Sequence, residues 1–236
     1  MSLFIGVSPA ARGGLSLATL FWNGQWPVSL LSVQRLGSVE DTVNRIVGMV
    51  GEWGELSAVG IDAPLTWSGA AGGWREVDGL VRKRLPPWAP RGWVRPPLAL
   101  PSSVTVQGVA LAWSLASEIR QGQLPRHSVI ETRSRVSLAQ LVPDLSLALT
   151  RYASPRVAAP TRQAHVTKIV ERFVDAGLVR LELGDAIDGP GLEALIGGLT
   201  ALGVAIPDAG LVVHELGGGS IRPVGRRPVA LLVALP

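Results

Sequence analysis

Short apolar runs separated by turn residues occupy the first part of the chain. Residues 3–8, 15–22 and 26–33 are apolar or alternate between apolar and polar positions, as half-buried β-strands do. Gly13-Gly14 and Asn23-Gly24 separate them, and Asn-Gly is a strong signal for a tight hairpin. The pattern predicts a three-stranded antiparallel meander.

A helix and a buried strand are expected next. Ser38 precedes apolar residues at helical spacing, which predicts a capped amphipathic helix ending near Trp53. The apolar run at 58–62 is typical of a buried strand, and Pro64 places Asp62 at or just past the carboxyl end of that strand. The helical crossover favours a strand parallel to the first one. Ligands collect at this edge of open α/β sheets, although an Asp there is also typical of a turn or a helix N-cap.

The rest of the chain alternates between predicted helices and strands. The strand at 127–131 ends in a second carboxylate, Glu131. Glu193 borders the apolar stripe of a later helix, and small residues on that side would let the helix approach the sheet closely. The expected helices are 74–85, 106–120, 134–142, 161–176 and 192–202. The expected strands are 127–131, 210–216 and 227–235, and 178–183 is either a brief strand or an extended link.

Residues 66–104 differ in composition from the sequence around them. Pro and Gly are dense, and four tryptophans lie among arginines: Trp67, Trp74, Trp88 and Trp93. A long segment of this kind inside a domain is usually functional or mobile. Two interpretations are open: the tryptophans form a stacking platform for nucleic-acid bases, or they pack beneath a Pro-rich loop.

Composition narrows the class of protein. The 236-residue chain is 47% hydrophobic and 17% charged, which indicates a globular protein, and we expect a single domain over 1–236 with an insertion at about 66–104 and a C-terminal hairpin at about 209–236. No signal sequence or membrane span is apparent, so we expect a cytoplasmic protein without a membrane partner. Cysteine is absent, which excludes disulfides and thiolate chemistry. The net charge of +4, almost all from Arg, allows a polyanionic partner and also suits a heat-adapted source.

The candidate chemistry lies in carboxylates that are far apart in the sequence. Asp62 and Glu131 end two predicted strands, and a helical region adds Glu193 or the pair Asp185 and Asp188. Carboxylates that converge repel one another, so such a cluster usually binds a divalent metal, and oxygen ligands suit Mg²⁺ or Mn²⁺. Two such ions can support hydrolysis of a phosphodiester.

Other motifs give weaker signals. A serine with a His and an Asp would be needed for acyl transfer, but no Gly-x-Ser-x-Gly elbow is present. His127, His165 and His214 are widely separated and favour packed or surface positions over metal ligation. The glycines at 217–219 read as a hairpin turn rather than a phosphate loop, and no Walker or dinucleotide motif occurs.

Four pieces of the sequence together resemble the DUF429 family of predicted nucleases with a ribonuclease H-like fold. In chain order they are Ile61-Asp62-Ala63-Pro64-Leu65, Trp74-Arg75-Glu76-Val77-Asp78 with the following Arg82, Val129-Ile130-Glu131, and Leu192-Glu193-Ala194-Leu195. The resemblance runs from the first strand to the helix near residue 202.

The resemblance implies a fold and a site. The fold would be a mixed five-stranded sheet in the order 3-2-1-4-5 with helices on both faces. Asp62, Glu131 and Glu193 would be catalytic, and Asp62 and Glu131 would hold Mg²⁺ or Mn²⁺ with Glu193, Asp188 or Asp185 completing the set. Arg75 and Asp78 would border the substrate cleft. Arg75, Arg82 and Arg95 are candidates for binding the phosphates of a nucleic acid.

One departure from the family pattern separates two hypotheses. The first strand ends in Gly6-Val7-Ser8, where the family commonly has an Asp in the last position. The chain is therefore either a weakened or one-metal nuclease, or a ribonuclease H-like protein that binds without cleaving. A phosphotransferase of the actin-like fold is a third class, disfavoured because the duplicated domains and phosphate loops are missing. The apolar end at 228–236 favours a core strand but would also suit a homodimer surface.

Overall fold

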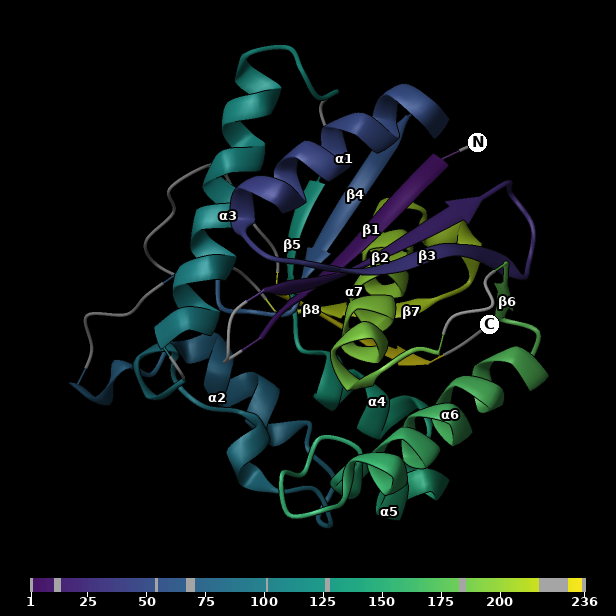
Figure 1. The fold of residues 1–236 in the computed structure, drawn as a ribbon. Coiled ribbons are helices and arrows are strands. Elements are labelled where there is room, and N and C mark those ends of the chain that lie inside the picture. Colours follow the sequence, from purple (N-terminus) through teal and green to yellow (C-terminus); the bar gives the residue numbers. More distant parts are fainter. Residues whose placement is uncertain are drawn as a thin grey trace.

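The fold is a mixed β-sheet with helices on both faces (Figure 1). It is seen in a computed structural model that describes residues 2–10, 14–53, 55–66, 71–100, 102–125, 128–182, 186–216 and 229–234. The strands of the described residues are β1 (Ser2–Pro9), β2 (Leu15–Trp22), β3 (Val28–Leu36), β4 (Leu56–Ile61), β5 (Ser128–Thr132), β6 (Val179–Leu181), β7 (Val212–Glu215) and β8 (Val229–Ala234).

The strand order is β6-β3-β2-β1-β4-β5-β8-β7. β1, β2 and β3 form the antiparallel meander that the sequence predicts, while β4 lies parallel to β1 and β5 lies parallel to β4. The described part of the sheet has eight strands rather than the five expected. The short β6 covers the edge of β3, and the antiparallel pair β7 and β8 continues the sheet beyond β5. The turn expected at 217–219 lies outside the described residues.

The helices mostly follow the predicted pattern, with shifted ends. Asp188 starts the last helix three residues earlier than expected, because its side chain accepts a hydrogen bond from the Gly191 backbone. A short helix at Ser146–Arg151 was not predicted. None of the described helices is both long and apolar enough to cross a membrane. The helices are α1 (Val39–Trp53), α2 (Glu76–Lys83), α3 (Ser102–Arg120), α4 (Ser134–Leu141), α5 (Ser146–Arg151), α6 (Ala159–Asp175) and α7 (Gly189–Ala205).

Alternation along the strands builds a core on each face of the sheet. Leu3, Ile5 and Val7 of β1 pack with α1 and α3 on one face, whereas Phe4 belongs to the core shared with α5, α6 and α7 on the other. Figure 1 shows α1 and α3 on one side and α7 against the opposite side, with α4, α5 and α6 beyond it. We call these the α3 face and the α7 face.

Glycines bring α7 unusually close to the sheet. A Cβ added to Gly6 would lie 1.7 Å from the Ala194 carbonyl oxygen, and one added to Gly60 would lie 2.1 Å from that of Gly197. Only residues without side chains fit at such contacts. The N-terminal part of α7, which carries Glu193, is thereby held against the ends of β1 and β4.

Candidate active site

Strand parity places Ser8 and Asp62 on the α7 face. Gly6 pairs with Gly60 in the parallel register of β1 and β4, and both glycines touch α7. Two positions further along each strand come Ser8 and Asp62, so they point to the same face. The Asp62 backbone N–H donates to the Val7 carbonyl at 2.8 Å, which holds the two strand ends side by side.

Glu193 of α7 meets these residues from the helix. Its carboxylate accepts a hydrogen bond from Ser8 Oγ at 3.2 Å, from Tyr152 Oη at 3.0 Å and from Arg135 Nε at 2.7 Å. Glu193 is 8% exposed. Burial and the neighbouring Glu193 carboxylate raise the pKa of Tyr152 well above its ordinary value, so the phenol acts as a donor. The three donors hold Glu193 in one orientation.

Asp62 is half-buried and incompletely neutralised. Its Oδ1 accepts a hydrogen bond from the Ser134 backbone N–H, at the start of α4, at 2.9 Å. Burial and the Glu193 carboxylate raise the pKa of Asp62 to about 7, although the Ser134 N–H, Arg133 and Arg135 oppose the change. A carboxylate pair of this kind attracts a positive charge, which can be a proton or a bound cation.

The pair opens into a cavity of about 570 Å³. Ser8, Asp62 and Glu193 line it together with arginines and with part of the 66–104 segment. Its volume lies within the range of roughly 300–1,000 Å³ that is usual for ligand sites. The other lining residues are Pro9, Ala10, Pro64, Gly92, Trp93, Arg95, Leu100, Val104, Arg133, Arg135, Val136, Pro155 and Pro190.

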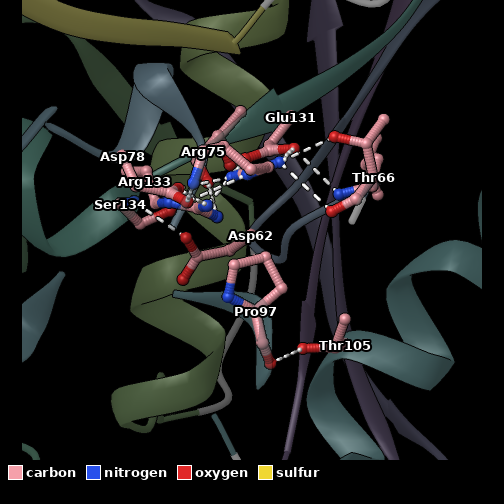
Figure 2. A network of polar contacts seen from close by, with 11 residues as sticks. Asp62, Thr66, Arg75, Asp78, Pro97, Thr105, Glu131, Arg133 and Ser134 are labelled. Atoms are coloured by element: carbon pink, nitrogen blue, oxygen red, sulfur yellow. Dashed lines mark hydrogen bonds and ion pairs between the residues drawn. The ribbon is translucent and has the colours of Figure 1, made fainter. Parts of the chain in front are cut away.

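Glu131 lies near the same edge of the sheet but is not among the residues that line the cavity. It pairs in register with Ile61, a residue of the α3-face core, and its neighbour Ile130 belongs to the core of the α7 face. Glu131 and Asp62 are therefore on opposite faces. Figure 2 shows the Glu131 carboxylate facing Arg75, while the Asp62 carboxylate faces Ser134.

Glu131 belongs to a buried ion-pair network. Arg75 donates to its two carboxylate oxygens at 2.6 and 2.8 Å, Arg133 Nη2 lies 2.7 Å away, and the Leu65 backbone N–H donates at 2.8 Å. Asp78 is the second acid, 2.5 Å from Arg75 and 3.2 Å from Arg133. Two guanidinium groups thus balance two carboxylates. Burial alone would raise the pKa of Asp78, but hydrogen bonds from Arg75 and the charge of Arg133 lower it overall.

Local structure explains how Arg75 and Asp78 enter this network. Arg75 is the N-cap of α2, and its backbone N–H donates to Asp78 Oδ2 at 3.1 Å, as in a capping box. The cap turns both side chains inward. Arg75 is only 4% exposed, and its Nη1 also donates to Thr66 Oγ1 at 3.0 Å. These residues fasten the start of α2 to the end of β5 rather than lining the cavity.

Of the remaining predicted site residues that the structure describes, Asp188 and Arg82 are not at the cavity, whereas Arg95 is. Asp188 caps α7 and forms a 3.8 Å ion pair with Arg35. Arg82 stacks over the Trp74 ring at 5.3 Å, whereas Arg95 lines the cavity. Asp185 lies outside the described residues, as do Trp67 and His127. The described residues contain no group of three His, Cys, Asp or Glu side chains that could hold a metal.

Three residues near the acid pair were not singled out by the sequence. Arg133 and Arg135 follow the β5 strand and flank Ser134, and Tyr152 comes from the end of α5. The sequence Arg-Ser-Arg directly after a buried strand could have indicated the two arginines. Arg is rarely buried without a partner, so arginines at that place predict nearby acids. Tyr152 is the sole tyrosine of the chain, and nothing in its local sequence indicated contact with Glu193.

Comparisons with known proteins find structural similarity but no sequence match. No family model matches the chain, so the resemblance to DUF429 gains no support there, and no curated protein matches. The solved structure of T. thermophilus RuvC in complex with a Holliday junction substrate aligns over 86% of this chain and 90% of its own. The identity is 13% and the TM-score is 0.35.

Proposed function

We propose that this chain is a nuclease-like protein of the ribonuclease H-like fold that hydrolyses phosphodiesters with one divalent cation. The fold assignment rests on the meander of β1, β2 and β3 followed by parallel β4 and β5, in the order 3-2-1-4-5 within the sheet. The observation that carries the function is the Asp62–Glu193 pair. The two acids come from different elements to one cavity and lack a full complement of positive charge.

The residues at the pair fit one cation but not two. Asp62 and Glu193 stand beside the Arg135 guanidinium, which leaves one negative charge among the three side chains. With the Ser8 hydroxyl they offer the oxygen donors that Mg²⁺ and Mn²⁺ prefer. A bridging third carboxylate is missing, because Ser8 occupies the end of β1 and Glu131 lies on the opposite face. Mg²⁺ or Mn²⁺ at this place would supply an activated water and neutralise charge on a phosphodiester.

The neighbouring side chains have assignable roles. Tyr152 and Arg135 orient Glu193, and the Ser134 backbone N–H orients Asp62. Arg135 is 40% exposed and Arg95 is also exposed at the cavity, so both can contact a substrate phosphate. In the metal-free protein the pKa of Asp62 is about 7, so a cation that binds there at neutral pH displaces part of a proton from this carboxyl.

A second function, binding without cleavage, is favoured by Ser8 and Glu131. Two positions that would carry metal in a complete two-ion site are a hydroxyl and a carboxylate already bound to two arginines. In this case the cavity would recognise a nucleic acid and release it unchanged.

A cleavage assay with matched variants tests both functions. Labelled DNA and RNA, single-stranded and duplex, are incubated with the protein in Mg²⁺, Mn²⁺ or EDTA, and the products are resolved on a denaturing gel. Cleavage should require the metal and should fall roughly 100-fold or more in Asp62→Asn and Glu193→Gln. Glu171→Gln, which alters an exposed carboxylate of α6, serves as the control and should cleave like wild type. Binding without cleavage in any ion would favour the second function, and Ser8→Asp should then introduce activity.

A further inference from the structure

The inserted segment builds one wall of the cavity and is firmly held there. Gly92, Trp93, Arg95 and Leu100 all line the cavity. The Pro97 carbonyl accepts a hydrogen bond from Thr105 Oγ1 at 3.1 Å, which ties the segment to α3 (Figure 2). Val94, Pro96 and Pro97 are buried. The wall is thus a packed part of the fold and not a loose loop.

Trp93 lines the cavity at this wall and is held there by its neighbours. Its ring stands edge-on to Trp88, with centroids 6.1 Å apart and planes at 84°. Trp93 is half-buried, because it packs against the core of the α7 face and also lines the cavity. An aromatic ring held in this way offers a preformed surface on which a planar group can stack.

Acidic and basic groups lie at different depths in the cavity. The carboxylates are its more buried groups, with Glu193 8% exposed. Two of the three arginines that line the cavity are more accessible: the Arg135 side chain is 40% exposed against 11% for that of Glu193, and Arg95 is exposed and donates to the Gly92 carbonyl at 3.1 Å. The third, Arg133, is buried and pairs with Glu131 and Asp78. A ligand that suits this arrangement combines a flat ring for Trp93 with an anionic group for the arginines, and places the anionic group near the acids. A nucleotide has both parts.

We propose that the cavity takes an unpaired nucleotide of a single-stranded nucleic acid, with the base stacked on Trp93 and the adjoining phosphate bound by Arg95. This rests on the proposed function, whose substrate class it names. In a duplex the base faces are covered by stacking, so a paired base would have to be extruded to reach Trp93. Single strands expose the base faces, and stacking on an aromatic side chain with a basic contact to the backbone is the usual mode of their recognition.

Binding of matched single-stranded and duplex probes tests the proposal. Fluorescence anisotropy is measured with a labelled DNA strand, its RNA equivalent and the same DNA strand in a blunt duplex, in EDTA and again in Ca²⁺. The single strands should bind at least about 10-fold more tightly than the duplex. Trp93→Leu should weaken single-strand binding roughly 5- to 100-fold. Trp113→Leu, which alters an exposed tryptophan of α3 away from the cavity, should bind like wild type.

If Trp93→Leu does not fold, a pair of arginine variants tests the proposal by the same binding measurement. Arg95→Gln should lower the slope of log affinity against log salt by about 1, as expected for loss of one phosphate contact. Arg91→Gln changes an exposed arginine of the same segment that does not line the cavity, and should leave the slope unchanged.

The outcomes separate this inference from the proposed function. Equal or tighter binding of the duplex, or wild-type binding by both Trp93→Leu and Arg95→Gln, would overturn the inference, even where cleavage still depends on Asp62 and Glu193. Binding that needs Trp93 and Arg95, with no cleavage in any ion, would support the inference and remove the hydrolytic function.

Discussion

Glu131 and Glu193 are both buried glutamates near the same edge of the sheet, yet their surroundings differ. Glu131 is 1% exposed and lies in a set where two arginines balance two acids. Glu193 is 8% exposed, forms an ion pair with Arg135 beside the second acid Asp62, and borders a cavity. A fully compensated carboxylate fastens elements together, whereas an incompletely compensated pair can take up a cation. Position at a strand end alone does not distinguish the two.

Removal of Glu131, the fully compensated glutamate, should have the largest effect on stability. Glu131→Ala leaves Arg75 and Arg133 buried with only Asp78 as an acid, so we expect the free energy of unfolding to fall by about 3–5 kcal/mol. Urea denaturation followed by circular dichroism measures it. Glu171→Gln on the surface should stay within about 0.5 kcal/mol of wild type. A loss for Glu131→Ala as small as that of the control would show that the network does not stabilise the fold.

A larger distance between α7 and the sheet should change the position of Glu193 and weaken metal binding. Gly6→Ala places a Cβ against the Ala194 backbone, so we expect a loss of about 3 kcal/mol and weaker metal binding, because Glu193 moves with the helix. Gly48→Ala is the matched control: nothing lies within 4 Å of its added Cβ, and in α1 it should stabilise by up to about 1 kcal/mol. Thermal denaturation and Mn²⁺ titration of both variants check the comparison.

Asp62, beside Glu193, and Asp78, beside Glu131, should change folding stability with pH in opposite directions. The pKa of Asp62 is raised from 3.8 to about 7, so the folded metal-free protein binds an extra proton between those values and loses stability as pH rises through them. Asp62→Asn should therefore be more stable than wild type at pH 8 in EDTA, by on the order of 2 kcal/mol, and similar at pH 4. Urea denaturation from pH 4 to 8 measures this.

Asp78 provides the contrast within the same experiment. Its pKa is lowered, so its stabilising effect is present at neutral pH and is lost as pH falls below the ordinary range of an Asp. Asp78→Asn should destabilise most at neutral pH. If both variants gave the same pH profile, the distinction between the compensated and uncompensated acids would be wrong.

The smallest expected effect concerns Asp188, one of the acids expected at the metal. Because its side chain caps α7, Asp188→Ala should cost about 1 kcal/mol of stability, while Asp188→Asn, which preserves the cap, should cost little. Neither should change Mn²⁺ affinity by more than about 2-fold, as a calorimetric titration would show. A large loss of Mn²⁺ binding in Asp188→Asn would place this acid at the metal.

Sequence reasoning located the edge of the sheet but not the face. Asp62 and Glu131 both end parallel strands, as the apolar runs indicated, and the small residues of the last predicted helix indicated the close approach of Glu193. The face depends on register, and Glu131 pairs with Ile61 instead of Asp62. Residues 128–132 carry little alternation because both faces of β5 are covered, so periodicity could not reveal this.

The partners of the arginines were also not predictable from the sequence. Arg75 resembled a phosphate ligand in the sequence, but three-dimensional pairing with Glu131 and Asp78 turns it inward. Arg133 and Arg135 lie two positions apart at the start of α4 and yet pair with different acids. The pairings of Arg75 with Glu131, of Arg133 with Asp78 and of Arg135 with Glu193 join residues more than 50 positions apart, and local sequence patterns do not contain that information.

Calorimetric titration of the metal-free protein with Mn²⁺ at pH 6.5, in two buffers of different ionisation enthalpy, tests the central claim most directly. We predict one bound ion with release of part of a proton from Asp62, and affinity lowered roughly 10-fold or more in Asp62→Asn and in Glu193→Gln. Absence of binding, or binding that both variants retain at wild-type strength, would contradict the account.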